Sequence, residues 1–139
     1  MRALLAAALL LVAFALPVKA AASISINEPG PYTKGDVITL TVDPGKLKGY
    51  EYPVVIIRCR NAAGDLLWTY FRRWDDGGLP NESGPEPVLL GGEPANTSIV
   101  WNSVGGDGHC TVQLYAYGGL AHPNPRIIAN APDIDVAGP

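Results

Sequence analysis

The fold is decided by two stretches that have the pattern of β-strands, Val54-Val55-Ile56-Ile57-Arg58-Cys59-Arg60 and Cys110-Thr111-Val112-Gln113-Leu114-Tyr115-Ala116-Tyr117. Successive side chains of a β-strand point to opposite sides, so Val55, Ile57 and Cys59 share one side of the first stretch. The same period places together, on one side of the second stretch, Cys110, Val112, Leu114 and Ala116. Both cysteines are therefore expected to face an apolar core.

Cys59 and Cys110 are the two cysteines of the chain. Two inward-facing cysteines on adjacent or facing strands can meet the short distance that a disulfide requires. A metal site would need further ligands nearby, and only His109 adjoins Cys110. A redox pair would read C-x-x-C, which the sequence lacks. We therefore expect a Cys59–Cys110 disulfide, formed in an oxidising compartment.

The N-terminal residues have the pattern of a secretory signal peptide. Arg2 is followed by an apolar run from Ala3 to Val18, and short side chains precede a break after Ala20. About sixteen apolar residues are fewer than the roughly twenty that span a bilayer as a helix. We expect a signal peptide at residues 1–20 and one secreted domain at residues 21–139, without stable membrane insertion after cleavage.

The charge balance bears on the choice of partner. The chain has 10 basic and 13 acidic residues. Loss of Arg2 and Lys19 with the signal peptide would leave a net charge of about −5. Nucleic-acid binding requires a basic surface, so no nucleic-acid partner is expected.

Further short alternating segments are separated by glycine and proline, and no segment after residue 20 has a sustained helical period. This pattern predicts an all-β sandwich or barrel. Besides Val54–Arg60 and Cys110–Tyr117, the expected strands are Ser23–Ile26, Val37–Val42, Leu66–Trp74 and Ser98–Trp101, with a weaker last strand from Arg126–Ile128 and Ile134–Val136.

The segment Asn61–Asp65 predicts a hairpin loop that fixes the register of its two strands. Pairing Arg60 with Leu66 places Cys59 opposite Leu67 and Val55 opposite Phe71, in the core. The same register places Arg58 opposite Trp68 on the outward side. A slip of one residue would bury arginines, which disfavours it.

The strand order resembles that of immunoglobulin-like (Ig-like) domains. Asp36–Val42 corresponds to strand B, Pro53–Arg60 to C, Leu66–Trp74 to C′, Ser98–Trp101 to E and Cys110–Tyr117 to F, with Gly105–Gly108 at the E–F corner. The cysteines depart from antibody domains, whose disulfide joins B and F. Here they fall on C and F.

Small Ig-like proteins of actinobacterial phages are similar in Gly49-Tyr50-Glu51-Tyr52-Pro53, Cys59, Asp107-Gly108-His109-Cys110-Thr111 and Leu114-Tyr115-Ala116-Tyr117-Gly118. The resemblance implies a two-sheet antiparallel Ig-like β-sandwich with one disulfide. It also implies binding or assembly rather than catalysis.

No catalytic fingerprint is present in the sequence. His109 and His122 are expected at a strand end and in a loop. The acidic residues Asp75, Asp76, Asp107, Asp133 and Asp135 are of the type that binds Ca²⁺, but they match no EF-hand loop and are typical of solvated turns. We therefore expect no enzyme activity, no metal and no cofactor. Asn81 and Asn96 fit the N-glycosylation pattern.

The outward side of the C, C′ and F strands is the first candidate binding surface. It is predicted to carry arginines and aromatic residues, which are enriched at binding hot spots: Arg58, Arg60, Trp68, Tyr70, Arg72, Trp74, Tyr115 and Tyr117. Two alternatives stay open. Such pairs can merely stabilise a solvent face, by about 0.2–1 kcal/mol each, or the loop Asp75–Pro87 can cover it. A second candidate is a loop tip formed by Tyr50, Tyr52 and His122.

These features predict a secreted, non-enzymatic Ig-like binding or adhesion module that recognises a cell-surface glycan or protein. The alternative is a structural or decoration subunit of a phage particle or extracellular assembly. A third hypothesis is a small hydrolase or inhibitor. The sequence favours no particular oligomeric state.

Overall fold

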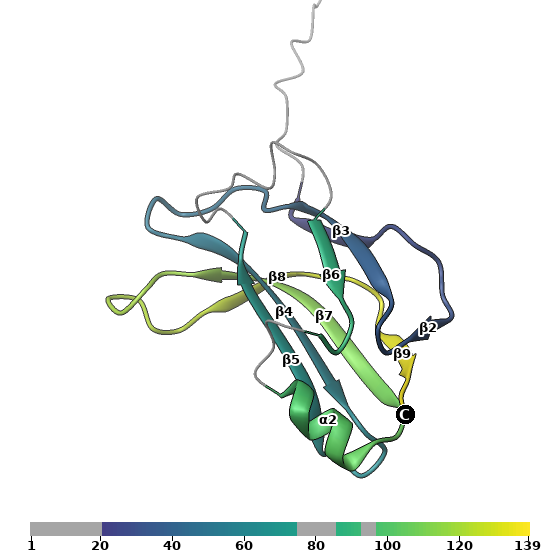
Figure 1. Ribbon diagram of the computed structural model, residues 1–139. Coiled ribbons are helices and arrows are strands. Elements are labelled where there is room, and N and C mark those ends of the chain that lie inside the picture. The colour runs from purple at the N-terminus through teal and green to yellow at the C-terminus, as the bar shows by residue number, and fades with distance from the viewer. Residues whose placement is uncertain (1–20, 75–85, 93–96) are drawn as a thin grey trace, which may run out of the picture.

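Most of the predicted alternating segments are strands in the computed structural model, which describes residues 21–74, 86–92 and 97–139. The predicted signal peptide, the acidic pair Asp75-Asp76, most of the loop Asp75–Pro87 and both glycosylation sites lie outside the described residues. The described elements are β1 (Ser23–Ile26), β2 (Tyr32–Thr33), β3 (Val37–Asp43), β4 (Tyr52–Arg60), β5 (Leu66–Arg73), β6 (Glu86–Leu89), α2 (Ser98–Val104), β7 (Gly108–Tyr117), β8 (Arg126–Asn130) and β9 (Ile134–Ala137) (Figure 1).

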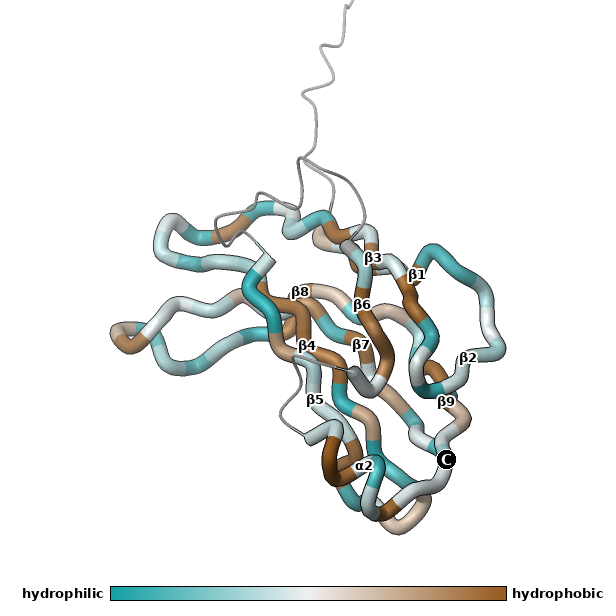
Figure 2. Tube along the Cα trace, viewed as in Figure 1, coloured by the Kyte–Doolittle hydropathy of each residue, from teal (hydrophilic) through white to brown (hydrophobic). Residues whose placement is uncertain are grey.

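The strands form two sheets that share one hydrophobic core. The smaller sheet has the order β1-β3-β6, and the larger has the order β2-β9-β7-β4-β5, with β8 also paired to β7. Ile38 and Leu40 of the small sheet belong to the same buried cluster as Val55 and Leu114 of the large sheet. Figure 2 shows hydrophobic segments along β4 and β6 in the middle of the molecule. The structure thus confirms an all-β, sandwich-like fold.

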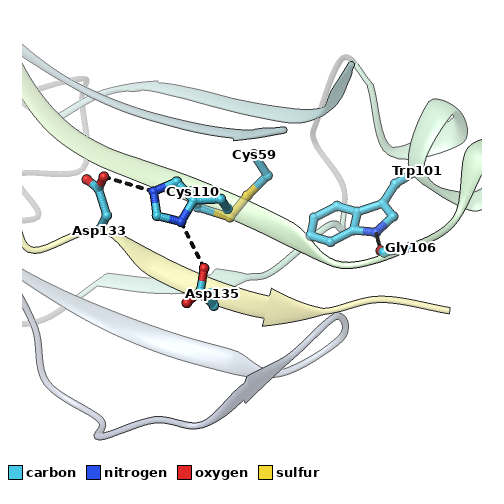
Figure 3. Close-up of a disulfide and its surroundings, with 7 residues drawn as sticks. Cys59, Trp101, Gly106, Cys110, Asp133 and Asp135 are labelled. Carbon is cyan, nitrogen blue, oxygen red and sulfur yellow. Dashed lines mark hydrogen bonds and ion pairs between the residues drawn. A yellow bond between two sulfur atoms is a disulfide. The ribbon is translucent and has the colours of Figure 1, made fainter. Parts of the chain in front are cut away.

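The centre of the large sheet is the antiparallel pair β4–β7. Its register runs from Tyr52 opposite Tyr117 to Arg60 opposite His109. Cys59 lies directly opposite Cys110, their Cα atoms are 4.0 Å apart, and the two residues form a disulfide (Figure 3). The predicted inward positions of both strands and the predicted disulfide are confirmed.

Strand β5 differs from its predicted register by one residue over most of its length. Leu66 pairs with Arg60 as predicted, but a register shift follows, and Trp68 rather than Leu67 pairs with Cys59. The prediction that Trp68, Tyr70 and Trp74 face outward is therefore wrong, because all three are buried in the core. The predicted core residue Phe71 is instead 51% exposed.

The β-bulge is favoured by the aromatic area that it removes from water. An aromatic side chain buries about 150–250 Å², so at about 25 cal/mol per Å² each ring contributes up to roughly 4–6 kcal/mol. Burying Trp68, Tyr70 and Trp74 outweighs the partial exposure of Phe71. Leu67 stays buried as well, and the indole Nε1 of Trp68 donates to the Gly92 carbonyl at 3.1 Å.

The segment Ser98–Trp101, predicted as a strand, forms the first half of helix α2 instead. Ser98 and Trp101 are three residues apart and face the interior, whereas Ile99 is 76% exposed. Gly105, with φ of 69°, ends the helix, and its N–H donates to the Trp101 carbonyl. A seven-residue helix rich in β-branched residues is too short to produce a clear helical period.

Other elements also differ from the sequence prediction. Strand β6 pairs with β3, in the place predicted for Ser98–Trp101. Strand β2, which was not predicted, pairs in parallel with β9. The single weak last strand is two strands, β8 and β9, which both pair with β7.

The disulfide should stabilise the fold substantially. It joins residues separated by 51 positions, and closing a loop of that length contributes roughly 4 kcal/mol in the chain-entropy model. We expect the mass of the oxidised protein to be lower than that of the reduced form by two hydrogens. The free energy of unfolding of the double variant Cys59→Ala/Cys110→Ala should be lower than that of the wild type by roughly the same 4 kcal/mol. Two free thiols in the purified protein would contradict the assignment.

The bulge predicts opposite outcomes for two aromatic truncations on β5. Trp68→Ala should lower the free energy of unfolding in urea by about 3–5 kcal/mol, as is typical of a buried ring. Phe71→Ala, at a half-exposed position, should cost less than about 1 kcal/mol. If Phe71→Ala proved the more destabilising, the unbulged register would be correct instead.

Candidate binding surface

The outer face is the side of β4, β5 and β7 that points away from the core, and it carries an aromatic cluster. The cluster consists of Tyr52 on β4, Phe71 on β5, and Tyr115 and Tyr117 on β7. The Tyr117 ring is central: its centroid lies 6.1 Å from Tyr52, 5.6 Å from Phe71 and 6.0 Å from Tyr115. These contacts arise because Tyr52 pairs directly with Tyr117, while Tyr115 is two residues along the same strand.

Two arginines contact the rings of this cluster. The guanidinium carbon of Arg73 lies 4.0 Å from the ring centroid of Tyr52, and that of Arg58 lies 5.9 Å from the centroid of Tyr115. A cation over an aromatic face is attracted by the ring quadrupole. The Nη1 of Arg58 also donates to the hydroxyl of Tyr115 at 3.3 Å.

A row of polar groups crosses the outer face beside the rings. The hydroxyl of Tyr115 donates to the side-chain carbonyl of Gln113 at 3.1 Å, and the amide nitrogen of Gln113 donates to the side-chain oxygen of Asn130 on β8 at 3.0 Å. With Arg58, this polar row reaches from β4 across β7 to β8. The surface therefore offers aromatic rings and planar hydrogen-bonding groups side by side.

The structure places only part of the predicted binding set on this surface. Arg58, Arg60, Tyr115 and Tyr117 lie on the outer face as predicted. Arg60 is at the far end, where its Nη1 donates to the Gly64 carbonyl of the hairpin loop at 3.0 Å. Trp68 and Tyr70 belong to the core, and Arg72 shares their register but is exposed.

Three members of the surface were not predicted: Tyr52, Phe71 and Arg73. Phe71 and Arg73 were missed because the bulge exchanges the two sides of β5. Tyr52 was missed because the predicted C-like strand begins at Pro53, whereas β4 begins one residue earlier. The sequence signal for Tyr52 was its position two residues before Val54, which places both residues on the same side of a strand that continues through the proline.

The loop tip lies at one end of the same surface. Tyr50, Glu51 and Tyr52 each contact the β7–β8 connection or its flanks. Tyr50 stacks on His122 with ring centroids 3.7 Å apart, Glu51 binds Arg126, and Tyr52 contacts Tyr117. Figure 1 shows this connection projecting from the sheets beside the loop that precedes β4. The predicted gathering of Tyr50, Tyr52 and His122 is present.

An open groove of about 350 Å³ lies at this tip, lined by Tyr52, Tyr117, Gly119, Leu120, His122 and Pro123. Leu120 is fully exposed. Since Tyr52 and Tyr117 belong to both the groove and the aromatic cluster, the two predicted candidate surfaces are continuous.

A bidentate ion pair holds the tip. The Nε and Nη2 atoms of Arg126 donate to the two carboxylate oxygens of Glu51 at 2.9 and 2.8 Å. The hydrogen bonds from Arg126, followed by that from the Lys48 backbone N–H, lower the pKa of Glu51 to about 2. The pair therefore keeps its charges throughout the physiological pH range. Burial raises the pKa of Tyr117, which stays a neutral phenol.

At the opposite end of the outer face, His109 lies between two carboxylates. Its Nδ1 is 2.8 Å from Asp135 and its Nε2 is 3.0 Å from Asp133 (Figure 3). A neutral imidazole has one N–H, whereas the imidazolium can donate to both carboxylates. The hydrogen bond with Asp135, followed by that with Asp133, raises the pKa of His109 above its ordinary value of 6.5.

The acidic residues considered as calcium ligands have other contacts where the structure describes them. Asp133 and Asp135 bind His109, and Asp107 accepts a hydrogen bond from the Gly138 N–H at 3.1 Å. Within the described ranges, no group of three or more His, Cys, Asp or Glu residues is arranged to hold a metal ion. No helix in the described part of the chain is long and apolar enough to cross a membrane.

Comparison of the chain with protein-family models, with curated proteins and with solved structures finds no match.

The His109 contacts predict a pH-dependent contribution to stability. Because its pKa is raised in the folded state, the contribution is fully present below pH 6.5 and is lost as the pH rises through the folded pKa. The melting temperatures of wild type and His109→Gln should therefore differ more near pH 5.5 than near pH 8.5. The difference should be small, because the side chain of His109 is 60% exposed. Asp135→Asn should weaken this dependence, and an equal difference at both pH values would contradict it.

Proposed function

We propose that this protein is a secreted, non-enzymatic Ig-like binding or adhesion module and that its ligand is a cell-surface glycan. The observation that carries the proposal is the continuous aromatic and polar surface running from the tip groove along the outer face. Sugars pack their C–H faces on aromatic rings, and their hydroxyls exchange hydrogen bonds with planar polar side chains. The aromatic cluster and the polar row supply both kinds of group.

The Ig-like assignment is supported by the order of the strands. The orders β1-β3-β6 and β9-β7-β4-β5 correspond to A-B-E and G-F-C-C′ of Ig-like sandwiches. Strand β6, not Ser98–Trp101, takes the place of E. The disulfide joins the C-like and F-like strands, which are neighbours in one sheet, and so differs from the B–F bridge of antibody domains.

Secretion and a non-catalytic role rest on separate observations. A buried disulfide is typical of proteins that fold in an oxidising compartment, and the N-terminal segment has the composition of a signal peptide. Both histidines contact other side chains, His109 two carboxylates and His122 the ring of Tyr50. These contacts favour a structural role for the imidazoles over acid–base catalysis.

A specific observation also favours the alternative, a structural or decoration subunit of a phage particle or other extracellular assembly. Helix α2 exposes Ile99, Val100 and Val104, and the paired residues Val37 and Leu89 are exposed on the small sheet. Exposed apolar residues of this kind are found at interfaces between subunits.

Binding to a glycan array, followed by titration with the polysaccharide that binds, tests the proposal. Tyr115→Ala and Phe71→Ala should each weaken binding by about 1–3 kcal/mol, as hot-spot residues do. The exposed residue Val37, on the other sheet, provides the control variant Val37→Ala, which should bind as wild type does. Melting temperatures of all variants should change little.

The competing outcomes are distinct. Loss of binding in Tyr50→Ala with full binding in Tyr115→Ala would confine the site to the tip. If no glycan binds and sedimentation shows stable self-association that Val100→Asp abolishes, the structural-subunit hypothesis replaces the binding module.

A further inference from the structure

Charge is distributed very unevenly over the sheet that carries the candidate site. Strands β4, β5 and β7 contain four arginines, of which Arg58, Arg60 and Arg73 lie on the outer face, and no aspartate or glutamate. The whole chain, in contrast, has 13 acidic and 10 basic residues. A basic patch on an acidic protein attracts anionic partners, and it has no such effect on neutral partners.

Three of the described carboxylates that border this patch contact cationic or titratable side chains. Glu51 is held by Arg126 at the tip, and Asp133 and Asp135 are held by His109 at the far end. These acids are therefore engaged away from the middle of the outer face, where Arg58 lies. Among the described residues, Arg58 contacts Tyr115 through the hydroxyl and the ring of that residue.

The position of Arg58 suits it to receive an anion. Its side chain is half-buried, and the hydrogen bond to the Tyr115 hydroxyl uses one nitrogen of a guanidinium that has five N–H donors. The guanidinium fork matches the geometry of carboxylate, sulfate and phosphate groups. Phe71 and Tyr117 lie on the neighbouring strands with their rings edge to face. An anionic group and an uncharged ring of one chain can therefore be held side by side.

We propose that the ligand of this surface is an anionic polysaccharide, with an acidic substituent bound by Arg58 and the adjoining sugar rings packed on Phe71 and Tyr117. This inference rests on the proposed glycan-binding function and narrows it to one chemical class. An acidic polypeptide would satisfy the charge equally well. The row Arg58–Tyr115–Gln113–Asn130, however, presents hydrogen-bond donors and acceptors across three strands. This arrangement suits the many hydroxyls of a sugar chain better than it suits the single extended backbone of a polypeptide.

Polymers that share one backbone provide the test: dextran, carboxymethyl-dextran and dextran sulfate, with poly-glutamate as the acidic polypeptide. Both anionic dextrans should bind the full-length secreted protein at least tenfold more tightly than dextran. That preference should shrink as salt rises, because the Debye length falls from about 10 Å at 0.1 M to about 3 Å at 1 M. Carboxymethyl-dextran and dextran sulfate together distinguish carboxylate from sulfate as the preferred anion.

Arg58→Gln should lose about ten- to a hundredfold in affinity for the anionic dextrans and little for dextran. Arg58→Lys, which keeps the charge but not the fork, should lose less. Lys46→Gln removes one positive charge from an exposed loop outside the three strands and should bind as wild type does. Unchanged melting temperatures would show that all three variants fold.

Four results would overturn the inference. Equal losses in Arg58→Gln and Lys46→Gln would show non-specific attraction, and tighter binding of poly-glutamate would indicate an acidic protein partner. Equal affinity for dextran and its anionic forms would leave a neutral glycan as the ligand, so the proposed function would stand without the inference. Failure to bind any polymer overturns the inference, while the glycan array decides the proposed function separately.

Discussion

The pairing of β4 with β7 is the constraint on which the rest of the structure depends. Its register is fixed by the disulfide, because Cys59 can bond to Cys110 only when the two residues lie opposite each other. Once that pair is set, Val55, Ile57, Val112 and Leu114 must face the core, and Arg58, Tyr115 and Tyr117 must face away from it. Gly108 fits the same arrangement: a Cβ there would lie 3.1 Å from the Trp101 ring and 3.4 Å from the Cys59 Cβ. The disulfide and the indole of Trp101 therefore pack tightly only around a glycine.

The sequence was sufficient to predict the strands that alternate strictly, and insufficient where one residue interrupts the alternation. In β7 the alternation is unbroken, and in β4 it is set by Arg58, Cys59 and Arg60, so the core side, the disulfide and part of the outer face were all predicted correctly. In β5 a single bulge reverses the two sides. Nothing local marks it, since Leu67 and Trp68 are both apolar and either can face inward. The bulge is decided by long-range burial of three aromatic rings, which appears only when the sheets pack.

The same distinction explains the remaining differences. Helix α2 buries the side chain of Trp101, whose Nε1 donates to the Gly106 carbonyl at 3.0 Å. That bond depends on the turn after the helix and not on helical periodicity. The members of the candidate surface on β4 and β7 could be predicted from the period of two, except for Tyr52, which precedes a proline. The continuity between the face and the tip could not be predicted, because it depends on how Tyr50, Glu51 and Tyr52 meet residues more than sixty positions later in the chain.

The two charged clusters at the ends of the outer face, Glu51–Arg126 and His109 with its two aspartates, change their charge in different pH ranges. Glu51 has a pKa of about 2, so its ion pair with Arg126 persists from mildly acidic to alkaline solution and keeps the groove in shape. His109 has a raised pKa, and its deprotonation removes one positive charge from the end of the surface that holds Asp133, Asp135 and the neighbouring Arg60. The field at that end of the surface then becomes less favourable to an anion. An anionic chain that extends from the groove past Arg58 toward Arg60 would consequently be held more tightly at the His109 end in mildly acidic than in alkaline solution.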